Sequence, residues 1–193
     1  MIDTVEPVDT KPRTWRHPWQ LGLNAPNIAI READRSATAI TPGAALQILP
    51  VGDMTLRVIQ GQEKPELLGW RIYDTIAKPW PVPTYEWQAD QTFSRAWIVQ
   101  MQTTEAQWPV RNVELVAGDE LGELRFKVHL RNGDIDHVFR RFPGQPPVEF
   151  DQEKVTGDLV IHRRDRNGGL SARLETKGGM DSVAKPARQT GQR

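Results

Sequence analysis

Short runs of apolar or alternating residues recur along almost the whole chain, and turn-forming residues separate most of them. The 15 prolines and 15 glycines, together with the lack of any sustained apolar stripe of helical period, argue against long helices. Alternating runs at this spacing are typical of strands that bury one face in a sandwich. The sequence therefore predicts an all-β fold, an antiparallel β-sandwich with little or no helix. The expected strands cover residues 27–31, 44–49, 54–60, 67–76, 93–101, 111–117, 123–130, 135–142, 159–163 and 170–175.

Length and composition limit both the organisation of the chain and its partners. The 193 residues suit one domain, predicted over residues 1–176, and the polar tail at 177–193 is expected to be disordered. Lysine plus arginine and aspartate plus glutamate each number 25, so no net field predicts binding to nucleic acid. No apolar run reaches about 18 residues, so no membrane span is expected. There is no cysteine, and the first residues lack the pattern of a signal peptide, which leaves the compartment open.

One hairpin can be predicted with its register. Asn132-Gly133 lies between two alternating runs, which favours a two-residue type I′ turn. Such a turn makes one face apolar and the other charged. On the apolar face it pairs Leu130 with Ile135, Val128 with His137 and Phe126 with Phe139; on the charged face it pairs Arg131 with Asp134, His129 with Asp136 and Arg125 with Arg140. The segment 166–169 is expected to form a second hairpin loop.

No metal or cofactor site is expected. The four histidines form no closely spaced pair, and the predicted hairpin places His137 on the apolar face and His129 on the charged face. His137 is therefore interpreted as a structural residue. Asp3, Asp9 and His17 could converge from neighbouring strands on a metal, but their spacing does not require it.

No self-contained active site is visible. The chain lacks a nucleophile elbow and a phosphate-binding glycine loop, and its paired acids, such as Asp134 and Asp136, fall at turns where carboxylates are usually solvated. One weaker hypothesis is a small enzyme with Tyr73 or Tyr85 as its base.

Tryptophan is over-represented, with seven residues, and part of this excess lies in the proline-rich segment 61–85. Because proline cannot donate to a strand ladder, this segment is predicted to be an extended, exposed crossing. Trp97 and Trp70 are interpreted as structural. Trp80 and Trp108 lie beside prolines in expected loops, and they are candidates for stacking on a sugar ring.

A basic stripe accompanies the predicted hairpin. It comprises Arg125, Lys127, His129, Arg131 and Arg140, together with Arg141, and further cations at His162, Arg163, Arg164 and Arg166 follow on a later strand. Arginine binds carboxylates and sulfates bidentately, so an acidic polysaccharide is the expected partner. The alternative is a solvated sheet face whose charges are offset by nearby aspartates.

Several segments resemble the C-terminal β-domain of heparinase II/III-like polysaccharide lyases. These are I-D-T-V-E-P-V-D-T-K-P-R-T-W, G-A-A-L-Q-I-L-P, V-I-Q-G-Q-E-K-P-E-L-L-G-W with the following P-V-P-T-Y, and G-D-L-V-I-H-R-R-D-R-N-G-G-L, within residues 2–174. The resemblance implies a helical toroid N-terminal to the β-domain and a cleft that performs β-elimination on uronic-acid polysaccharides. It also implies a periplasmic or extracellular parent enzyme.

The chain departs from the pattern of that family in two ways. The toroid, with the Asn, His and Tyr that the family uses, is missing from these residues, and Arg13 stands where the pattern has a histidine before Thr14-Trp15. Asp3 matches a family aspartate without an assigned role. The resemblance therefore implies a structural or glycan-contacting module that is inactive alone; the alternative is a free-standing carbohydrate-binding or protein-interaction sandwich.

Overall fold

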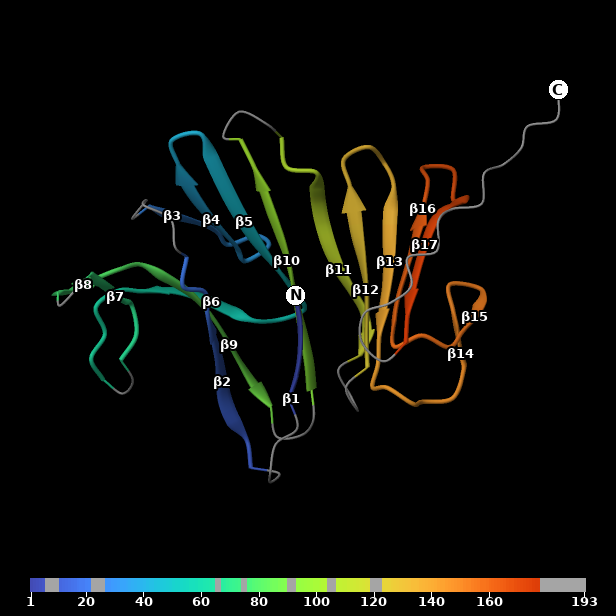
Figure 1. The fold of residues 1–193 in the computed structure, drawn as a ribbon, viewed down its shortest axis with the longest axis horizontal. Helices are drawn as coiled ribbons and strands as arrows, with labels where there is room; N and C mark the ends of the chain where they lie inside the picture. The colour runs from blue at the N-terminus through green and yellow to red at the C-terminus, as the bar shows by residue number, and fades with distance from the viewer. Residues whose placement is uncertain are drawn as a thin grey trace. The chain divides into compact units, whose positions relative to one another are not determined.

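The computed structural model describes residues 1–5, 11–21, 27–64, 67–73, 76–89, 93–103, 107–118 and 123–177. Within these ranges every regular element is a β-strand, and the strand pairs are antiparallel (Figure 1). The predicted all-β, antiparallel fold is therefore confirmed. Across the same ranges there is no helix of the length and apolarity that a membrane crossing requires.

The chain divides into two compact units. The first contains Met1–Ile2, Pro7–Gln91 and Ala96–Trp108, and the second contains Asp3–Glu6, Thr92–Arg95 and Pro109–Arg193. The predicted single domain over residues 1–176 stays a prediction, because compact units of one chain need not fold separately. Of the predicted tail, residues 178–193 lie outside the described part of the chain.

The first unit is built from two facing sheets and a small ribbon, except that Asp3–Glu6 and Thr92–Arg95, which contribute to the larger sheet, are assigned to the second unit. The strands of the larger sheet, in spatial order, are β1 (Ile2–Val5), β10 (Phe93–Gln102), β5 (Ala44–Val51), β4 (Ser36–Thr41) and β3 (Ile28–Arg31). The second sheet orders β2 (Arg13–Pro18), β9 (Val82–Ala89) and β6 (Thr55–Ile59), and the ribbon pairs β7 (Trp70–Tyr73) with β8 (Ile76–Pro79). Ile48 and Trp97 from the larger sheet pack with Tyr85 from the second sheet. The inward-facing side chains of the two sheets therefore form one hydrophobic core. Trp97 is fully buried, which confirms its structural interpretation.

The proline-rich segment differs from its prediction. Strand β9 begins at Val82 and is the central strand of its sheet, and Pro83 and Thr84 within it are buried. The prediction of an exposed crossing is therefore wrong for this half of the segment. The Pro83 carbonyl, the backbone hydrogen-bonding group that proline retains, accepts the N–H of Trp19 at 2.9 Å.

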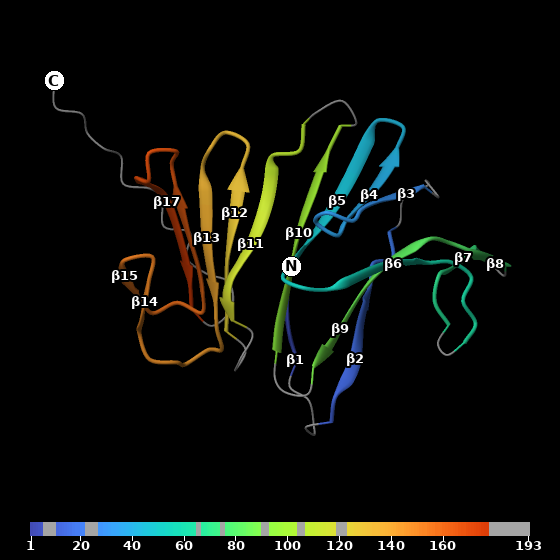
Figure 2. The same ribbon diagram turned by 180° about the vertical axis from the view of Figure 1, so that it is seen from behind.

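The second unit contains a five-stranded antiparallel sheet whose strands lie side by side in both views (Figures 1 and 2). Its order is β11 (Val110–Gly118), β12 (Leu124–Leu130), β13 (Ile135–Arg140), β16 (Leu159–Arg164) and β17 (Leu170–Thr176). A short ribbon of β14 (Val148–Phe150) and β15 (Glu153–Val155) connects β13 to β16. Phe150 and Val155 of this ribbon pack on Phe139 and Val160, so the ribbon covers one face of the sheet, named here the ribbon face.

The predicted register of the β12–β13 hairpin is wrong by one residue. The structure pairs Phe126 with Val138 and Lys127 with His137. Gly133 N–H donates to the Leu130 carbonyl, Leu130 N–H donates to the Asp134 carbonyl, and Gly133 has φ 93°. This is a three-residue loop, a type I turn followed by a glycine bulge, and not a type I′ turn. Because successive strand residues alternate between faces, the shift moves every β13 side chain to the other face relative to β12.

The second predicted hairpin loop is confirmed, and it repeats the same loop form. Asp165 N–H donates to the Gly169 carbonyl, Gly168 N–H donates to the Asp165 carbonyl, and Gly168 has φ 84°. The Asp165 carboxylate also accepts the N–H groups of Asn167 and Gly169. The two loops that join β12 to β13 and β16 to β17 therefore share one geometry.

Candidate functional site

Three basic side chains of the predicted stripe follow one strand on the ribbon face. Arg125, Lys127 and His129 alternate along β12, and the register places them on the same face as His137 and Phe139. Side chains two positions apart on a strand are separated by roughly 6.7 Å. All three are partly exposed. This row, Arg125, Lys127 and His129, is named here the β12 cation row.

The partners of the β12 cation row differ along the strand. The guanidinium of Arg125 lies over the ring of Phe139, 4.9 Å from its centroid, and 3.6 Å from the Glu123 carboxylate. His129 Nε2 lies 3.1 Å from Glu114 Oε2. The aromatic face of Phe139 therefore holds the guanidinium of Arg125 in a side chain that is still partly exposed.

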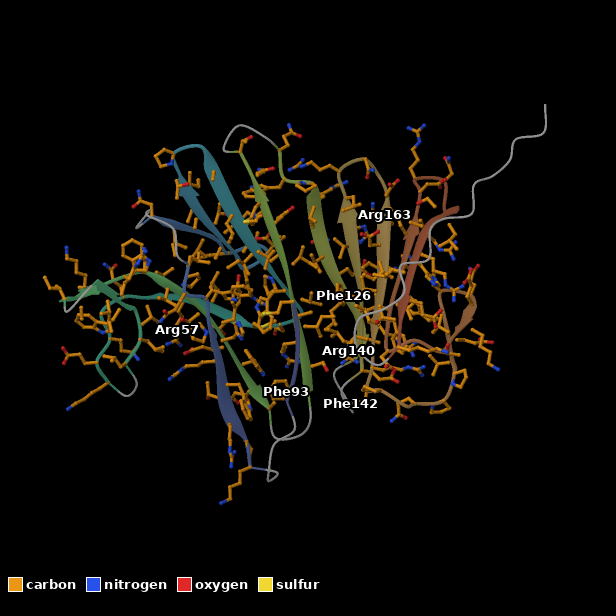
Figure 3. The ribbon with its side chains drawn as sticks, viewed as in Figure 1. Arg57, Phe93, Phe126, Arg140, Phe142 and Arg163 are labelled. Carbon is orange, nitrogen blue, oxygen red and sulfur yellow. The ribbon has the colours of Figure 1, made fainter. Side chains whose placement is uncertain are left out.

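The other predicted members of the stripe do not join this row. Arg140 pairs with Leu124 and lies on the opposite face from Arg125, and Figure 3 shows Arg140 and Arg163 at opposite ends of the sheet. Arg131 lies in the hairpin loop. Arg141 is fully buried and donates to the carbonyls of Gly157 and Pro146. The predicted cluster is therefore corrected to the β12 cation row, because a one-residue shift separates Arg140 from Arg125.

The candidate tryptophans belong to the first unit, whereas the β12 cation row belongs to the second. Trp80 is half-buried, its backbone N–H donates to Gly69, and the Arg71 guanidinium lies over its ring at 4.7 Å. Trp108 is also half-buried. Trp70 donates its ring N–H to the Gln62 carbonyl at 2.9 Å, which fits the structural interpretation of that residue.

The turn of the β14–β15 ribbon carries an unusual backbone. Asp151 and Gln152 have φ values of 51° and 68°, and Phe150 pairs with Glu153 across them. Two successive residues with positive φ form a type I′ turn, for which Asn-Gly is the favoured sequence. A non-glycine residue there costs about 1–3 kcal/mol and persists only where other contacts hold it. Asp151 has such contacts.

Asp151 is the centre of a buried charged cluster on the ribbon face. Its carboxylate is only 7% exposed and accepts Arg164 Nε at 2.8 Å, while Arg164 Nη2 donates to its backbone carbonyl at 3.0 Å. His137 Nδ1 lies 3.1 Å from Oδ1, and Nδ1 of the fully buried His162 lies 3.3 Å from Oδ2. Since a carboxylate only accepts, His162 presents Nδ1–H to it, and the tautomer with a proton on Nδ1 is the one that suits the contact of His137.

This arrangement sets the orientation and the charge of His137. With Nδ1 held by Asp151, Nε2 lies on the opposite side of the ring, and the side chain is 21% exposed. Burial lowers the pKa of His137 below its ordinary value, the Asp151 carboxylate opposes this, and the positive charges of Lys127 and Arg164 add to the lowering. The neutral form of His137 is therefore favoured more than in a free imidazole.

A second group of charges borders the Asp151 cluster. Arg173 bridges Glu153 at 2.7 Å and Glu175 at 2.6 Å. Burial alone would raise the pKa of Glu175, but hydrogen bonds from Arg173 and from the N–H groups of Thr156 and Gly157 lower it to about 2. Glu175 thus ties the segment after β15 to strand β17.

Other chemistry is limited among the described residues. They contain no group of three or more His, Asp or Glu placed to hold a metal ion. Asp3 has no described side chain and Asp9 lies outside the described residues, while His17 packs on the ring of Trp97 at 4.5 Å. Asp136 is not solvated as predicted, because Arg163 binds it through two hydrogen bonds.

The hypothesis of a tyrosine base fails for Tyr85. Its side chain is fully buried, and its hydroxyl lies 3.1 Å from the carbonyls of Arg35 and Ile48, where it acts as a donor. Burial raises the pKa of this hydroxyl far above its ordinary value. The Tyr73 side chain lies outside the described residues.

The sequence pattern did not predict the Asp151 cluster. It placed His137 and His129 on opposite faces, but the register puts both on the ribbon face, each with its own acidic partner. It also placed His162 in an exposed basic group, whereas His162 is buried. The Asp151-Gln152 turn lacks the glycine that marks such turns in a sequence. Of the residues in the cluster, only His137 and His162 lay on runs that the sequence predicted to be strands, and Arg164 came directly after the second of these runs.

Comparison of the chain with protein families, with curated proteins and with solved structures finds no match.

Proposed function

We propose that this protein is a β-sandwich module that binds an acidic polysaccharide through the ribbon face of its second unit, without catalysing elimination by itself. The observation that carries the proposal is the β12 cation row, three partly exposed basic side chains on one face of one strand. An extended polyanion offers carboxylates or sulfates at regular intervals, and a strand offers cations at regular intervals in the same way.

The distribution of charge supports a local site. The whole chain carries equal numbers of acidic and basic residues, so retention on a polyanion at neutral pH requires a local cationic surface. Arg125 is suited to the bidentate binding of sulfate or carboxylate, and Lys127 adds a compact charge beside it. The resemblance of the sequence to the β-domain of heparinase II/III-like lyases favours a uronic-acid polysaccharide as the ligand.

Heparin-affinity chromatography tests this proposal. We expect the wild-type protein to be retained at low salt. It should elute as the salt concentration rises, because the screening length of exposed charges falls to about 8 Å at physiological ionic strength. Arg125→Ala and Lys127→Ala should elute at lower salt. Arg140→Ala is the matched control, because it removes the same charge from the opposite face and should elute with the wild type.

Two outcomes would contradict the proposal. One is a wild-type protein that flows through at low salt, which would leave the β12 cation row a solvated sheet face. The other is a loss of retention in Arg140→Ala equal to that in Arg125→Ala, which would mean that charge alone and not its position decides retention. Melting temperatures of the variants show that each is folded.

A further inference from the structure

His137 adjoins the β12 cation row and is held in one orientation. It pairs directly with Lys127 across β12 and β13, and the Asp151 carboxylate holds its Nδ1 from the ribbon turn. From β16, its cross-strand neighbour His162 and Arg164 both bind the same carboxylate. Lys127, Asp151, His162 and Arg164 are therefore the charged and titratable groups that face this imidazole from three elements.

We propose that His137 is a proton-coupled binding residue for the anionic groups of the polysaccharide: its Nε2 takes up a proton when a sulfate or carboxylate binds, keeps that proton, and donates a hydrogen bond to the anion. This inference rests on the proposed function. The proton comes from solvent and adds to the Nε2 lone pair, and no covalent bond of the ligand changes. Asp151 acts as a positioning residue, because its contact with Nδ1 orients the His137 ring so that Nε2 points away from Asp151.

Electrostatics explain why the coupling arises. In the unliganded protein, the burial of the ring and the nearby cations Lys127 and Arg164 disfavour a positive charge on His137. A bound anion near Nε2 offsets those cations and favours the protonated form. By linkage, the affinity for the anion must then rise as the pH falls, by at most about tenfold per pH unit for one coupled proton.

Calorimetry measures the coupled proton directly. A short heparin oligosaccharide of defined length is titrated into the full chain near pH 6.5 in two buffers of different ionisation enthalpy. The difference in binding enthalpy gives the number of protons taken up. We expect a fraction of a proton, up to one, for the wild type, and close to none for His137→Gln. His129→Gln is the comparison variant: it removes the imidazole of the β12 cation row, and it should take up more protons on binding than His137→Gln does.

The outcomes separate this inference from the proposed function. If the wild type binds and His137→Gln takes up as many protons as the wild type, His137 is not the coupled group, while the proposed function stands. If only His129→Gln abolishes the uptake, the same conclusion follows. If the wild type binds no oligosaccharide at any pH, both fail. Should His137→Gln not fold, an NMR titration of the wild-type His137 ring must show a higher pKa with ligand than without it.

Discussion

Asp151 shows how a single side chain can hold an unfavourable backbone in place. Its positive φ and that of Gln152 are conformations that L-residues rarely adopt. The energy that offsets this cost comes from the Asp151 carboxylate, which binds two histidines and Arg164 in a buried setting. Gln152 contributes to the same turn, but its backbone strain has no such compensation in the cluster. The two neighbours therefore differ in what a glycine would change.

A pair of glycine substitutions tests this account. Gln152→Gly should leave the stability unchanged or raise it by up to about 1 kcal/mol, because it relieves the strain of a positive φ at a small entropic cost. Asp151→Gly relieves the same strain but removes the buried carboxylate that accepts from His162 and from Arg164 Nε, so it should cost about 2–4 kcal/mol. Denaturant unfolding of the two variants gives both values. Equal effects would mean that the carboxylate does not hold the turn.

At the scale of elements, the β12–β13 hairpin decides which side chains can form a site. Its strands were predictable from the alternation of residues 123–130 and 135–142. Its loop was not, because Asn-Gly suits both a type I′ turn and a type I turn with a glycine bulge. One residue of loop length moved His137 from the apolar face to the ribbon face and separated Arg140 from Arg125. The site residues were therefore predicted wrongly because the loop type was wrong, while the strands themselves were predicted correctly.

Substitutions in the loop distinguish these two turns. Of residues 131–133 in this loop, only Gly133 has a positive φ, and the Asn132 side-chain oxygen accepts the Asp134 N–H at 3.1 Å. Gly133→Ala should therefore cost about 1–2 kcal/mol, whereas Asn132→Ala should cost less than about 1 kcal/mol. A type I′ turn needs positive φ at both positions, so comparable losses of unfolding free energy would contradict the observed loop.

Some strands gave no usable sequence signal. Strand β9 runs through Pro83, and prolines argue against a central strand, yet Val82 and Thr84 on either side of it are buried. Strands β14 and β15 have three residues each, too short for alternation to be recognised. Since β14 and β15 carry the turn that holds Asp151, the cluster could be found only once the backbone was known.

At the scale of the whole molecule, the aromatic residues are divided between the two units. All seven tryptophans lie in the first unit, and all five phenylalanines lie in the second. Tryptophan fluorescence therefore reports on the first unit alone, while far-ultraviolet circular dichroism reports on the strands of both. The second unit also takes Asp3–Glu6 and Thr92–Arg95 from stretches of sequence that otherwise belong to the first. Neither unit is a continuous piece of chain.

This interleaving, with the predicted single domain over residues 1–176, leads us to expect one cooperative unfolding transition. Val155→Ala in the second core should cost about 1–3 kcal/mol, because Val155 is fully buried against Phe139, Phe150 and Val160. In denaturant, it should lower the fluorescence and dichroism midpoints equally, since loss of either core would release segments that both units need. Met54→Ala in the first core is the reciprocal control. A dichroism midpoint that falls while the fluorescence midpoint stays unchanged would instead show two independently folding domains.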